Sequence, residues 1–536
     1  MQGGGGTRAL RMDDFEDPVA KTARERFGIA GLHPYQRLVA ANVLDASAPG
    51  AERLRQMVIL PTGFGKSLCF QLPALLLPGT TLVVYPLLAL MSDQRRRLDS
   101  IGIGSALLRG GMSAHEVRAE EARVERGEAR IIIANPEVLR GSRALAFLKE
   151  AGLSHIAVDE AHCVSEWGES FRPAYLELGR IVEELAPPAL SAFTATASPS
   201  VLESVTRILF RGEGYILVEG YPDRPNIHYA VTRTLCRERR LLALVRELPK
   251  PLVVFCSSRE GAQMASRLLL ERLGRSELRF YHAGLRRDEK EEVERWFMPS
   301  KDGILCSTCA FGLGVDKKDI RSVIHFQPPP SVEAYLQEAG RAGRDGLPAS
   351  AVLISSPADA DRLERETEGQ RRERYRALLD YAESDRGCRR EALLDLLGAP
   401  REGRTPCSGC DRCDGSPNAL AEGEAELRLF ASANARRFSR DEALDLLKGR
   451  TPSRLSGQRC AYWGALADWD AKDASRCLDE AIRRGVIGIG RAWPWKGLIG
   501  PARRLYGSSG PGAGAGVLGA AREAVPRIAA RGRRRR

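Results

Sequence analysis

Pro61-Thr62-Gly63-Phe64-Gly65-Lys66-Ser67 is the stretch that decides the fold. It lies between an apolar run, Met57 to Leu60, which predicts a buried strand, and a segment with helical periodicity. In that position Gly63 and Gly65 let backbone N–H groups close around phosphate oxygens at a helix N-terminus, and Lys66 adds a positive charge. The same residues in an arbitrary loop would mean little. Between a strand and a helix they predict a nucleotide phosphate site.

An acidic partner for this site follows later in the chain, in Ile156-Ala157-Val158-Asp159-Glu160-Ala161-His162. Asp159 at the end of a buried strand suits Mg²⁺ coordination together with Ser67, and Glu160 suits orienting and deprotonating an attacking water. A strand that simply ends in solvated acids is the alternative. Two matched sites in this order favour hydrolysis of a nucleotide such as ATP, and we include Thr62 among the nucleotide-binding residues.

Short apolar runs alternate with helical patterns along the chain, which is typical of parallel strands buried on both faces. The first series of expected strands covers residues 57–60, 81–85, 130–134, 155–158 and 191–193. The second series covers residues 252–256, 278–282, 304–307 and 323–326. The pattern predicts an α/β fold with two tandem parallel-sheet lobes that are joined near residues 212–226.

A cationic group is expected from the second lobe, because phosphoryl transfer needs positive charge near the γ-phosphate. The sequence Gln337-Glu338-Ala339-Gly340-Arg341-Ala342-Gly343-Arg344 follows the strand that ends at Phe326. Its spacing predicts that Arg341 and Arg344 share one face of a helix. Such a pair alone is usually a solvated surface. Behind an upstream nucleotide site, both residues become candidates for arginine fingers.

The net charge of +12 says little about the folded part of the chain. Nine Arg and one Glu lie in residues 501–536, so this segment holds +8 and leaves +4 elsewhere. Residues 1–10 lack the apolar run of a signal peptide, and Pro and Gly interrupt the apolar stretch 74–91. We therefore expect a cytoplasmic location and no membrane partner. In that reducing compartment the 12 Cys are expected to be thiols or metal ligands.

Four cysteines are spaced like the ligands of a metal: Cys407, Cys410 and Cys413, with Cys388 upstream. Four thiolates predict a closed tetrahedral zinc site of structural type, because no position stays open for water. Four unrelated thiols are the alternative. The other eight cysteines, such as Cys69, lie in apolar contexts and are expected to be packed thiols.

The motifs, in this order, resemble those of RecQ helicases in superfamily 2. The resemblance is carried by PTGFGKSLCFQLP (61–73), VYPLLALMSDQ (84–94), DEAHCVSEWGESFRPAY (159–175), FTATAS (193–198), AFGLGVDK (310–317) and QEAGRAGRDG (337–346). It extends over roughly residues 20–415 and includes the cysteine positions. It implies two RecA-like lobes and a zinc module, with ATP, Mg²⁺ and Zn²⁺ as cofactors. The implied activity is 3′-to-5′ translocation on single-stranded DNA and duplex unwinding, in recombination and repair.

The resemblance also implies roles that spacing cannot show. Gln36 would pair with the adenine edge, and Asp316 would lie near the cleft between the lobes with the nucleotide. Thr194 and Thr196 would couple the ATP state to lobe closure, and Gln337 would join the catalytic set.

An aromatic-rich loop, residues 167–172, would sense single-stranded DNA and communicate with Glu160. From the residues alone, Trp167 and Phe171 are plausible stacking platforms and Arg172 is a phosphate partner. Two aromatic residues in a core are the alternative.

The remaining segments give a looser pattern. Residues 437–447 resemble the start of a winged helix with Ser439 as N-cap, and helices near 427–434 and 470–484 and a strand near 486–490 fit such a DNA-binding unit. A generic helical bundle is the alternative. The Arg-rich residues 531–536 either contact phosphates or only aid solubility. The expected boundaries are 1–14 (disordered), 15–213 (lobe 1), 214–358 (lobe 2), 359–416 (zinc module), 417–500 (winged helix) and 501–536 (disordered).

The expected partners are single-stranded and duplex DNA and a single-strand-binding protein, with the chain as a monomer that associates with the nucleoid in a bacterium. An RNA-acting or non-unwinding translocase of the same superfamily is one alternative. A zinc-dependent DNA-binding protein with a vestigial ATP site is another. The intact set of Lys66, Asp159 and Glu160 with the two arginines argues against the latter.

The sequence departs from the family pattern at two places. The usual stacking Tyr and the Arg before the nucleotide site are Ile29 and His33, which leaves the selectivity for adenine open. In the aromatic-rich loop the usual Gln and His are Glu166 and Glu169.

The two acidic residues of the loop should weaken strand binding electrostatically, most at low salt. We expect DNA to stimulate ATP hydrolysis less than is usual for the family, and the substitutions Glu166→Gln and Glu169→His to raise the stimulation. Hydrolysis rates measured against single-stranded DNA concentration at two salt concentrations test this. Stimulation that both substitutions leave unchanged would contradict it.

Overall fold

The computed structural model describes most of the chain. The described residues are 17–61, 64–166, 173–220, 223–274, 277–312, 317–367, 369–399, 401, 404–415, 420–455, 460–491 and 493–502. Several expectations lie outside them. These are Thr62 and Gly63, the loop 167–172, Asp316, and the terminal segments 1–14 and 503–536, together with the side chain of Glu166.

Seven parallel strands form the sheet of the first lobe, in the order β3-β4-β2-β5-β6-β1-β7. They are β1 Leu54–Ile59, β2 Thr80–Val84, β3 Ser105–Leu108, β4 Ile131–Ala134, β5 Leu153–Val158, β6 Ala189–Thr194 and β7 Ile216–Glu219. The five strands expected from the sequence are confirmed. The two missed strands, β3 and β7, are the edges of the sheet, and β7 is short and largely exposed, so its sequence lacks the signal of a buried strand.

Helices cover both faces of this sheet. They are α1 Pro18–Phe27, α2 Pro34–Asp45, α3 Leu68–Leu76, α4 Leu88–Ser100, α5 Ala114–Glu125, α6 Pro136–Leu139, α7 Ser142–Glu150, α8 Cys163–Glu166, α9 Leu178–Leu185 and α10 Pro199–Ile208, with the 3₁₀ turn η2 Pro173–Tyr175. Met57 and Ile59 enter one core, and Val58 and Leu60 enter the other. This alternation is the period of two that a strand buried on both faces requires.

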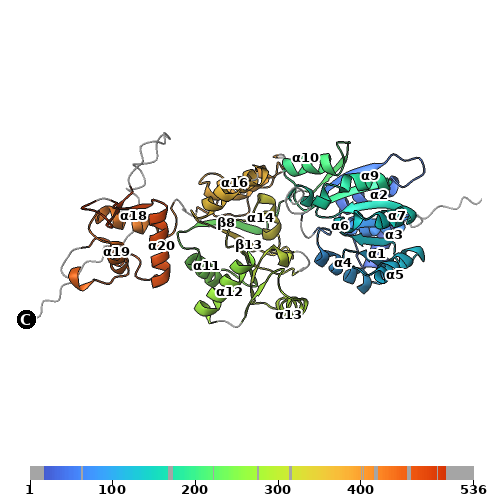
Figure 1. Cartoon of the computed structure of the whole chain (residues 1–536). Coiled ribbons are helices and arrows are strands. Elements are labelled where there is room, and N and C mark those ends of the chain that lie inside the picture. Colours follow the sequence, from blue (N-terminus) through green and yellow to red (C-terminus); the bar gives the residue numbers. More distant parts are fainter. Residues whose placement is uncertain are drawn as a thin grey trace, which may run out of the picture. The chain divides into compact units, whose positions relative to one another are not determined.

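The second lobe has a six-stranded sheet in the order β10-β11-β9-β12-β13-β8. The strands are β8 Ile227–Arg233, β9 Leu252–Phe255, β10 Leu278–Tyr281, β11 Ile304–Ser307, β12 Ser322–His325 and β13 Ala349–Ser355. The four expected strands are confirmed, and β8 and β13 were missed. The helices are α11 Arg237–Glu247, α12 Arg259–Leu273, α13 Arg287–Phe297, α14 Val332–Ala339, α15 Asp359–Arg365, α16 Gly369–Glu383 and α17 Arg389–Leu396, with η3 Cys309–Gly312. Helices α14 and α16 pack together on one face of this sheet, beside β8 and β13 (Figure 1).

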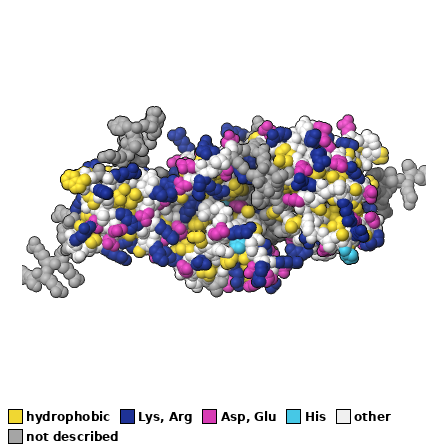
Figure 2. Space-filling model, in the orientation of Figure 1, with side chains coloured by type: hydrophobic (Ala, Val, Ile, Leu, Met, Phe, Trp, Pro, Cys, Tyr) yellow, Lys and Arg dark blue, Asp and Glu magenta, His cyan; other side chains and the backbone are white. Residues whose placement is uncertain are grey.

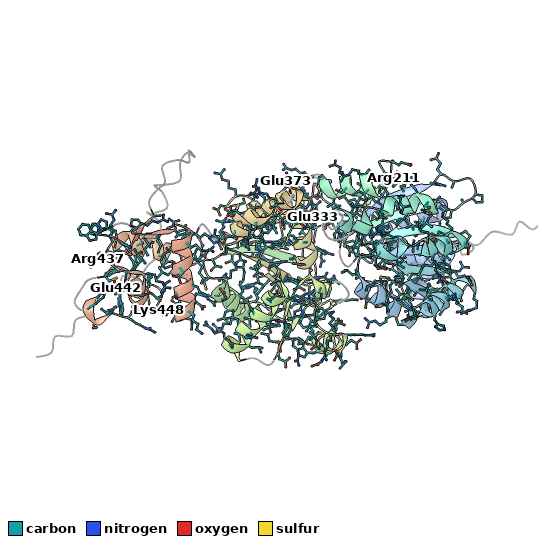
Figure 3. The ribbon with its side chains drawn as sticks, viewed as in Figure 1. Arg211, Glu333, Glu373, Arg437, Glu442 and Lys448 are labelled. Carbon is teal, nitrogen blue, oxygen red and sulfur yellow. The ribbon has the colours of Figure 1, made fainter. Side chains whose placement is uncertain are left out.

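The C-terminal part contains three helices and a two-stranded antiparallel hairpin. Its elements are α18 Glu424–Ala433, α19 Arg440–Leu447, η4 Ser453–Leu455, α20 Ala471–Arg483, β14 Ile487–Ile489 and β15 Ile499–Pro501. The expected N-cap Ser439 is confirmed, because its hydroxyl accepts the N–H of Glu442 while the Glu442 carboxylate accepts the N–H of Ser439. At the other end of α19, Lys448 donates to the carbonyls of Leu466 and Ala467 (Figure 3). The helices and the strand predicted for this region are therefore present.

By packing, the chain divides into two compact units. One contains residues 1–231, 247–353 and 363–416, and the other contains residues 232–246, 354–362 and 417–536. The segment around α11 thus groups with the C-terminal helices, through Leu235 and Cys236 in their shared core. The domain boundaries expected from the sequence remain predictions.

The surface and the cysteines agree with most of the expectations from composition. Lys and Arg side chains are interspersed with Asp and Glu over the visible face (Figure 2). No described helix has the length and apolar character that crossing a membrane requires. All 12 Cys are free, and Cys69 and Cys256 are buried as predicted. Cys309 is exposed, so the expectation of packed thiols was wrong for this residue.

A buried histidine gives the first lobe a pH-dependent stability. His155 in β5 is fully buried, its Nε2 lies 2.8 Å from Ser191 Oγ, and burial lowers its pKa to about 3. The unfolded chain then binds one more proton than the folded chain between pH 6.5 and 3. The free energy of unfolding should therefore decrease as the pH is lowered through that range. At pH 5 the decrease should be roughly 2 kcal/mol.

We expect His155→Gln, which keeps a polar group near Ser191, to lose less stability than the wild type between pH 7.5 and pH 5. Melting temperatures at both pH values measure the difference. The exposed His115 on α5 provides the control His115→Gln, which should behave as the wild type. An equal decrease in melting temperature in the wild type and both variants would contradict the expectation.

Candidate active site

The loop between β1 and α3 has the geometry that a phosphate-binding loop needs. Gly65 has φ +70°, and a Cβ at this position would lie 2.7 Å from Gln36 Nε2. Glycine is therefore required on both conformational and steric grounds. Lys66 Nζ donates to the carbonyl of Leu60 at 3.3 Å, and Ser67 is the N-cap residue of α3. The described part of the loop thus places Lys66 and Ser67 at the carboxyl end of β1.

Gln36 lies against this loop. Its Nε2 donates to the carbonyl of Phe64 at 2.8 Å, and its Oε1 accepts the N–H of His33 at 2.9 Å. The side chain is almost completely buried, at 7% exposed. Gln36 therefore ties the start of α2 to the phosphate loop, and its contact with adenine remains a prediction.

One of the residues that depart from the family pattern, His33, belongs to an aromatic group beside the same loop. His33 stacks on Tyr35 with ring centroids 5.2 Å apart, and Phe64 meets His33 edge-on at the same distance. Ile29 instead packs against the small core that α1, α2 and α3 share. The aromatic surface at this end of α2 thus comes from His33, Tyr35 and Phe64, which the sequence analysis did not identify.

The acidic residues follow β5. Burial and the neighbouring Glu160 carboxylate raise the pKa of Asp159 to about 7, while the charge of Lys66 opposes this shift. Glu160 has φ +50°, a left-handed conformation that is unfavourable for a residue with a side chain and is typical of functional sites. Its Oε2 is buried, 3.4 Å from His162 Nδ1, and accepts no hydrogen bond within the described residues. A cation between Lys66 and Asp159 would favour the ionised form of Asp159.

Hydrogen bonds join this acidic segment to the end of β6. His162 Nδ1 lies 3.0 Å from Thr194 Oγ1, which in turn donates to the carbonyl of Thr196 at 2.8 Å. The N–H of Leu60, at the end of β1, donates to the carbonyl of Thr194 at 3.1 Å. The phosphate loop, the acidic segment and the two threonines are therefore one connected structure.

The two arginines of the second lobe do not lie on a helix, and that prediction was wrong. Helix α14 ends at Ala339, and Arg341 and Arg344 lie in the following turn, residues 340–344, which we call the arginine turn. Gly343 has φ +55°, and a Cβ there would lie 2.5 Å from Asn226 Nδ2. Gly340 and Gly343 therefore end the helical path that the spacing of the arginines suggested. Gln337 lies within α14 and is partly buried.

Arg341 is a buried cation. Its side chain is 5% exposed, and its Nε has no hydrogen-bond partner among the described residues. Burial and the charge of Arg344 lower the pKa of Arg341 to about 9, and the carboxylates of Glu338 and Glu160 act in the opposite direction. Arg341 therefore remains protonated at neutral pH, with positive charge available to an anion.

Two residues that sequence reasoning missed hold the arginine turn. Arg224 donates to the carbonyls of Gly340, Ala342 and Gly343 at 3.0–3.1 Å. Asn226 Nδ2 donates to the carbonyls of Gly343 and Leu347 at 2.8 and 2.9 Å. The only signal in the sequence is the polar string Asp223-Arg224-Pro225-Asn226 before β8, which has no motif spacing of its own.

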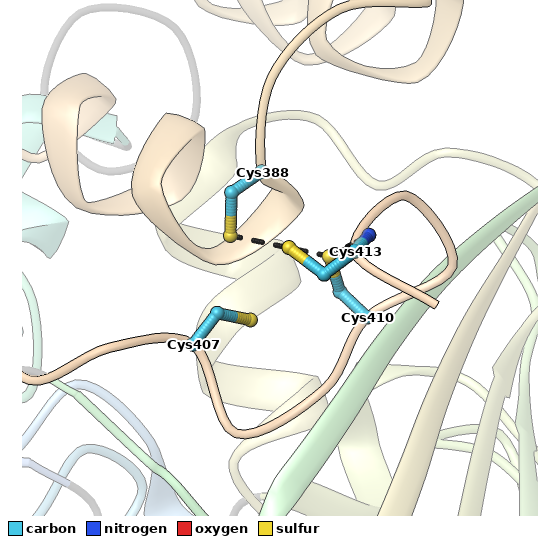
Figure 4. Close-up of side chains that lie close together, drawn as sticks. All are labelled: Cys388, Cys407, Cys410 and Cys413. Carbon is cyan, nitrogen blue, oxygen red and sulfur yellow. Dashed lines mark hydrogen bonds between the residues drawn. The ribbon is translucent and has the colours of Figure 1, made fainter. Parts of the chain in front are cut away.

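The four predicted zinc ligands come together as expected. The sulfur atoms of Cys388, Cys407, Cys410 and Cys413 all lie within 4.8 Å of one another (Figure 4). Cys388 Sγ and Cys410 Sγ are 3.9 Å apart, close to the ~3.8 Å separation in a tetrahedral site with Zn–S bonds of ~2.3 Å. This donor set fits zinc.

Cys410 is already prepared for metal binding. Burial alone would raise its pKa, but hydrogen bonds from backbone N–H groups, those of Cys413 and Arg389 first, lower the pKa of Cys410 to about 7. A thiolate is the form that binds zinc. Asp411 then fixes the loop, because it accepts hydrogen bonds from Arg389 and from the N–H of Val231 in β8.

Comparison with protein-family models gives three matches along the chain. They are DEAD/DEAH box helicase over residues 33–205, helicase conserved C-terminal domain over residues 236–346, and RecQ zinc-binding over residues 352–414. The third match contains all four clustered cysteines.

The ATP-dependent DNA helicase RecQ of Pasteurella multocida is 33% identical over 494 residues, which cover 89% of this chain and 76% of the relative. The chain belongs to the RecQ family of ATP-dependent DNA helicases. RecQ of Haemophilus influenzae is 34% identical over 69% of this chain and 60% of its own length. The probable helicase RecS of Bacillus subtilis is 36% identical over 65% of this chain and 68% of its own length. The RecQ resemblance inferred from the motifs is thus confirmed.

Solved structures agree with the RecQ fold. The DUF1998 helicase MrfA bound to DNA has a TM-score of 0.54 at 18% identity, over 92% of this chain and 60% of its own length. Mss116p bound to single-stranded RNA has a TM-score of 0.52 at 16% identity, over 73% and 89%. These likenesses concern the fold alone.

The zinc module of this RecQ protein yields a prediction about metal content. We expect Cys410→Ser to lose zinc and to lower the melting temperature, because three thiolates cannot complete the closed site. Zinc per chain, measured by atomic emission, should fall from about one to near zero. Cys460→Ser replaces a partly buried thiol outside the cluster and should retain the metal. Full zinc content in Cys410→Ser would contradict the expectation.

Proposed function

We propose that this protein uses ATP hydrolysis to move 3′ to 5′ along single-stranded DNA and to unwind duplex DNA. The observation that carries the proposal is the connected structure at the ends of β1, β5 and β6, which holds Lys66, Asp159 and Glu160 beside Thr194. Motors of this kind use such a site to make strand movement depend on hydrolysis. The RecQ relatives support DNA as the nucleic acid.

The residues divide the chemistry between them. Lys66 neutralises phosphate charge, while Ser67 and Asp159 would hold Mg²⁺, which supplies further charge neutralisation when bound. The buried Oε2 of Glu160 accepts no hydrogen bond within the described residues, and it is suited to orienting the attacking water and accepting its proton. Arg341 and Arg344 would stabilise negative charge that develops on the γ-phosphate, and Gln337 would assist. The charge of Glu160 acts on Arg341 by raising its pKa, which supports the proposal that the two residues act on one nucleotide.

The remaining expectations extend this proposal. Thr62, Gly63 and Asp316 would complete the nucleotide site, and Trp167, Phe171 and Arg172 would contact single-stranded DNA. Zinc would hold the cysteine module together, and the C-terminal helices with their hairpin would grip duplex DNA as a winged helix. We also propose a monomer in the cytoplasm that contacts a single-strand-binding protein and acts in recombination and repair.

Strand displacement tests the proposal directly. We expect the protein to unwind 3′-tailed duplexes and to leave 5′-tailed duplexes intact, with Lys66→Ala reducing both unwinding and ATP hydrolysis by at least about a hundredfold. Hydrolysis measured with single-stranded DNA and with RNA separates a DNA helicase from an RNA-acting relative. ATP hydrolysis that persists unchanged in Lys66→Ala would contradict the proposal that this site hydrolyses ATP.

A further inference from the structure

The segment Asp223-Arg224-Pro225-Asn226 lies between the zinc module and the arginine turn, and its residues alternate between the two. Asp223 pairs with Arg390, and the carbonyl of Pro225 accepts a hydrogen bond from Ser408, both in the zinc module. Arg224 and Asn226 donate to the arginine turn. Pro225 and Asn226 form a turn that is closed by a hydrogen bond from the N–H of Ile227 to the carbonyl of Arg224, so this short segment can contact both structures.

On the zinc side, Arg390 joins both parts of the cysteine cluster to this segment. It lies two residues after Cys388, and it donates to Thr405 Oγ1 at 2.9 Å and to the carbonyl of Pro406 at 3.0 Å, just before Cys407. Its Nε donates to Asp223 Oδ1 at 2.6 Å. Both charged side chains are buried, at 2% and 4% exposed. The position of Asp223 therefore depends on the loops that carry the cysteines.

On the other side, Arg224 organises carbonyl groups that have lost their helical partners. The carbonyls of the last helical turn and of the residues just beyond it need donors from elsewhere. The planar guanidinium of Arg224 serves the carbonyls of Gly340, Ala342 and Gly343 at once, which a lysine ammonium cannot reproduce with the same geometry. These three carbonyls flank Arg341 in the chain and precede Arg344. Arg224 thus fixes the backbone from which both side chains project.

We propose that Arg224 is a positioning residue for ATP hydrolysis, and that the zinc module orders the arginine turn through the Asp223–Arg390 pair and Arg224. The inference rests on the proposed function of Arg341 and Arg344. Arg224 acts through the turn and needs no contact with the nucleotide. Zinc in this protein then has a second consequence besides local folding, because it sets the geometry of residues that act on the γ-phosphate.

Steady-state ATP hydrolysis by the full chain with single-stranded DNA tests the role of Arg224. We expect Arg224→Ala to lower kcat at least about tenfold, because a displacement of about 1 Å in a charged group is costly for catalysis. KM for ATP should change less than about twofold, since the phosphate loop belongs to the first lobe. Arg224→Lys should recover only part of kcat. Zinc content should match the wild type, because Arg224 has no contact with the cysteines.

A matched pair of variants tests the zinc side. Arg390→Met removes the partner of Asp223, whereas Arg404→Met removes an arginine whose side chain is 7% exposed and whose carboxylate partners, Glu391 and Asp395, lie within the zinc module. We expect the first to lower kcat and the second to leave it near the wild-type value. Arg390→Met combined with Arg224→Ala should lower kcat little more than Arg224→Ala alone, because both act on the same element.

The outcomes separate this inference from the proposed function. A wild-type protein that hydrolyses ATP with DNA, together with an unchanged kcat in Arg224→Ala, would overturn the inference alone. Equal losses in Arg390→Met and Arg404→Met, or a double variant whose losses multiply, would also overturn it. A wild-type protein without hydrolysis would overturn both. If Arg390→Met loses zinc or has a lower melting temperature than the wild type, the inference is tested instead by the kcat and KM of Arg224→Ala and Arg224→Lys.

Discussion

Parallel strands place their carboxyl ends along one edge of a sheet, and the first lobe depends on that constraint. The ends of β1, β5 and β6 carry the phosphate loop, the acidic pair and the two threonines. Because β6 lies between β1 and β5, Thr194 can reach the base of the phosphate loop through its carbonyl and His162 through its hydroxyl. A change at any of the three ends is therefore felt at the other two.

The sequence predicted every interior strand of the first sheet and all but β13 of the second, for a physical reason. A strand such as β1, buried on both faces, must be apolar throughout, and its alternating residues enter two cores. Edge strands are not bound by this requirement. The strand β7 exposes Ile216 and Leu217 by about half, and its four residues give no distinct pattern. Of the two missed strands in the first lobe, only β7 is largely exposed; β3 is buried at three of its four positions, and it was missed because four residues give no distinct pattern.

The candidate site was predictable to the extent that its residues are close in the sequence. The cysteine cluster was found from ligand spacing, and Lys66 with Ser67 from a strand, a loop and a helix in order. The arginine turn was misjudged because two glycines, Gly340 and Gly343, outweigh helical spacing. Arg224 was missed because its carbonyl partners lie more than 100 residues away, and no local pattern encodes a hydrogen bond to so distant a backbone group.

Burial shifts the titration of the two charges proposed for catalysis in opposite directions. It raises the pKa of Asp159, an acid, and lowers the pKa of Arg341, a base, since each loses hydration of its charged form. In the proposed function, a nucleotide with its cation would supply what each lacks, positive charge beside Asp159 and negative charge beside Arg341. Burial of these two charges thus lowers the stability of the ligand-free protein, at the residues that would gain most from ligand binding. Rigid supports such as Arg224 on the arginine turn and His162 beside Glu160 are then required, because a mobile charge would move to water instead.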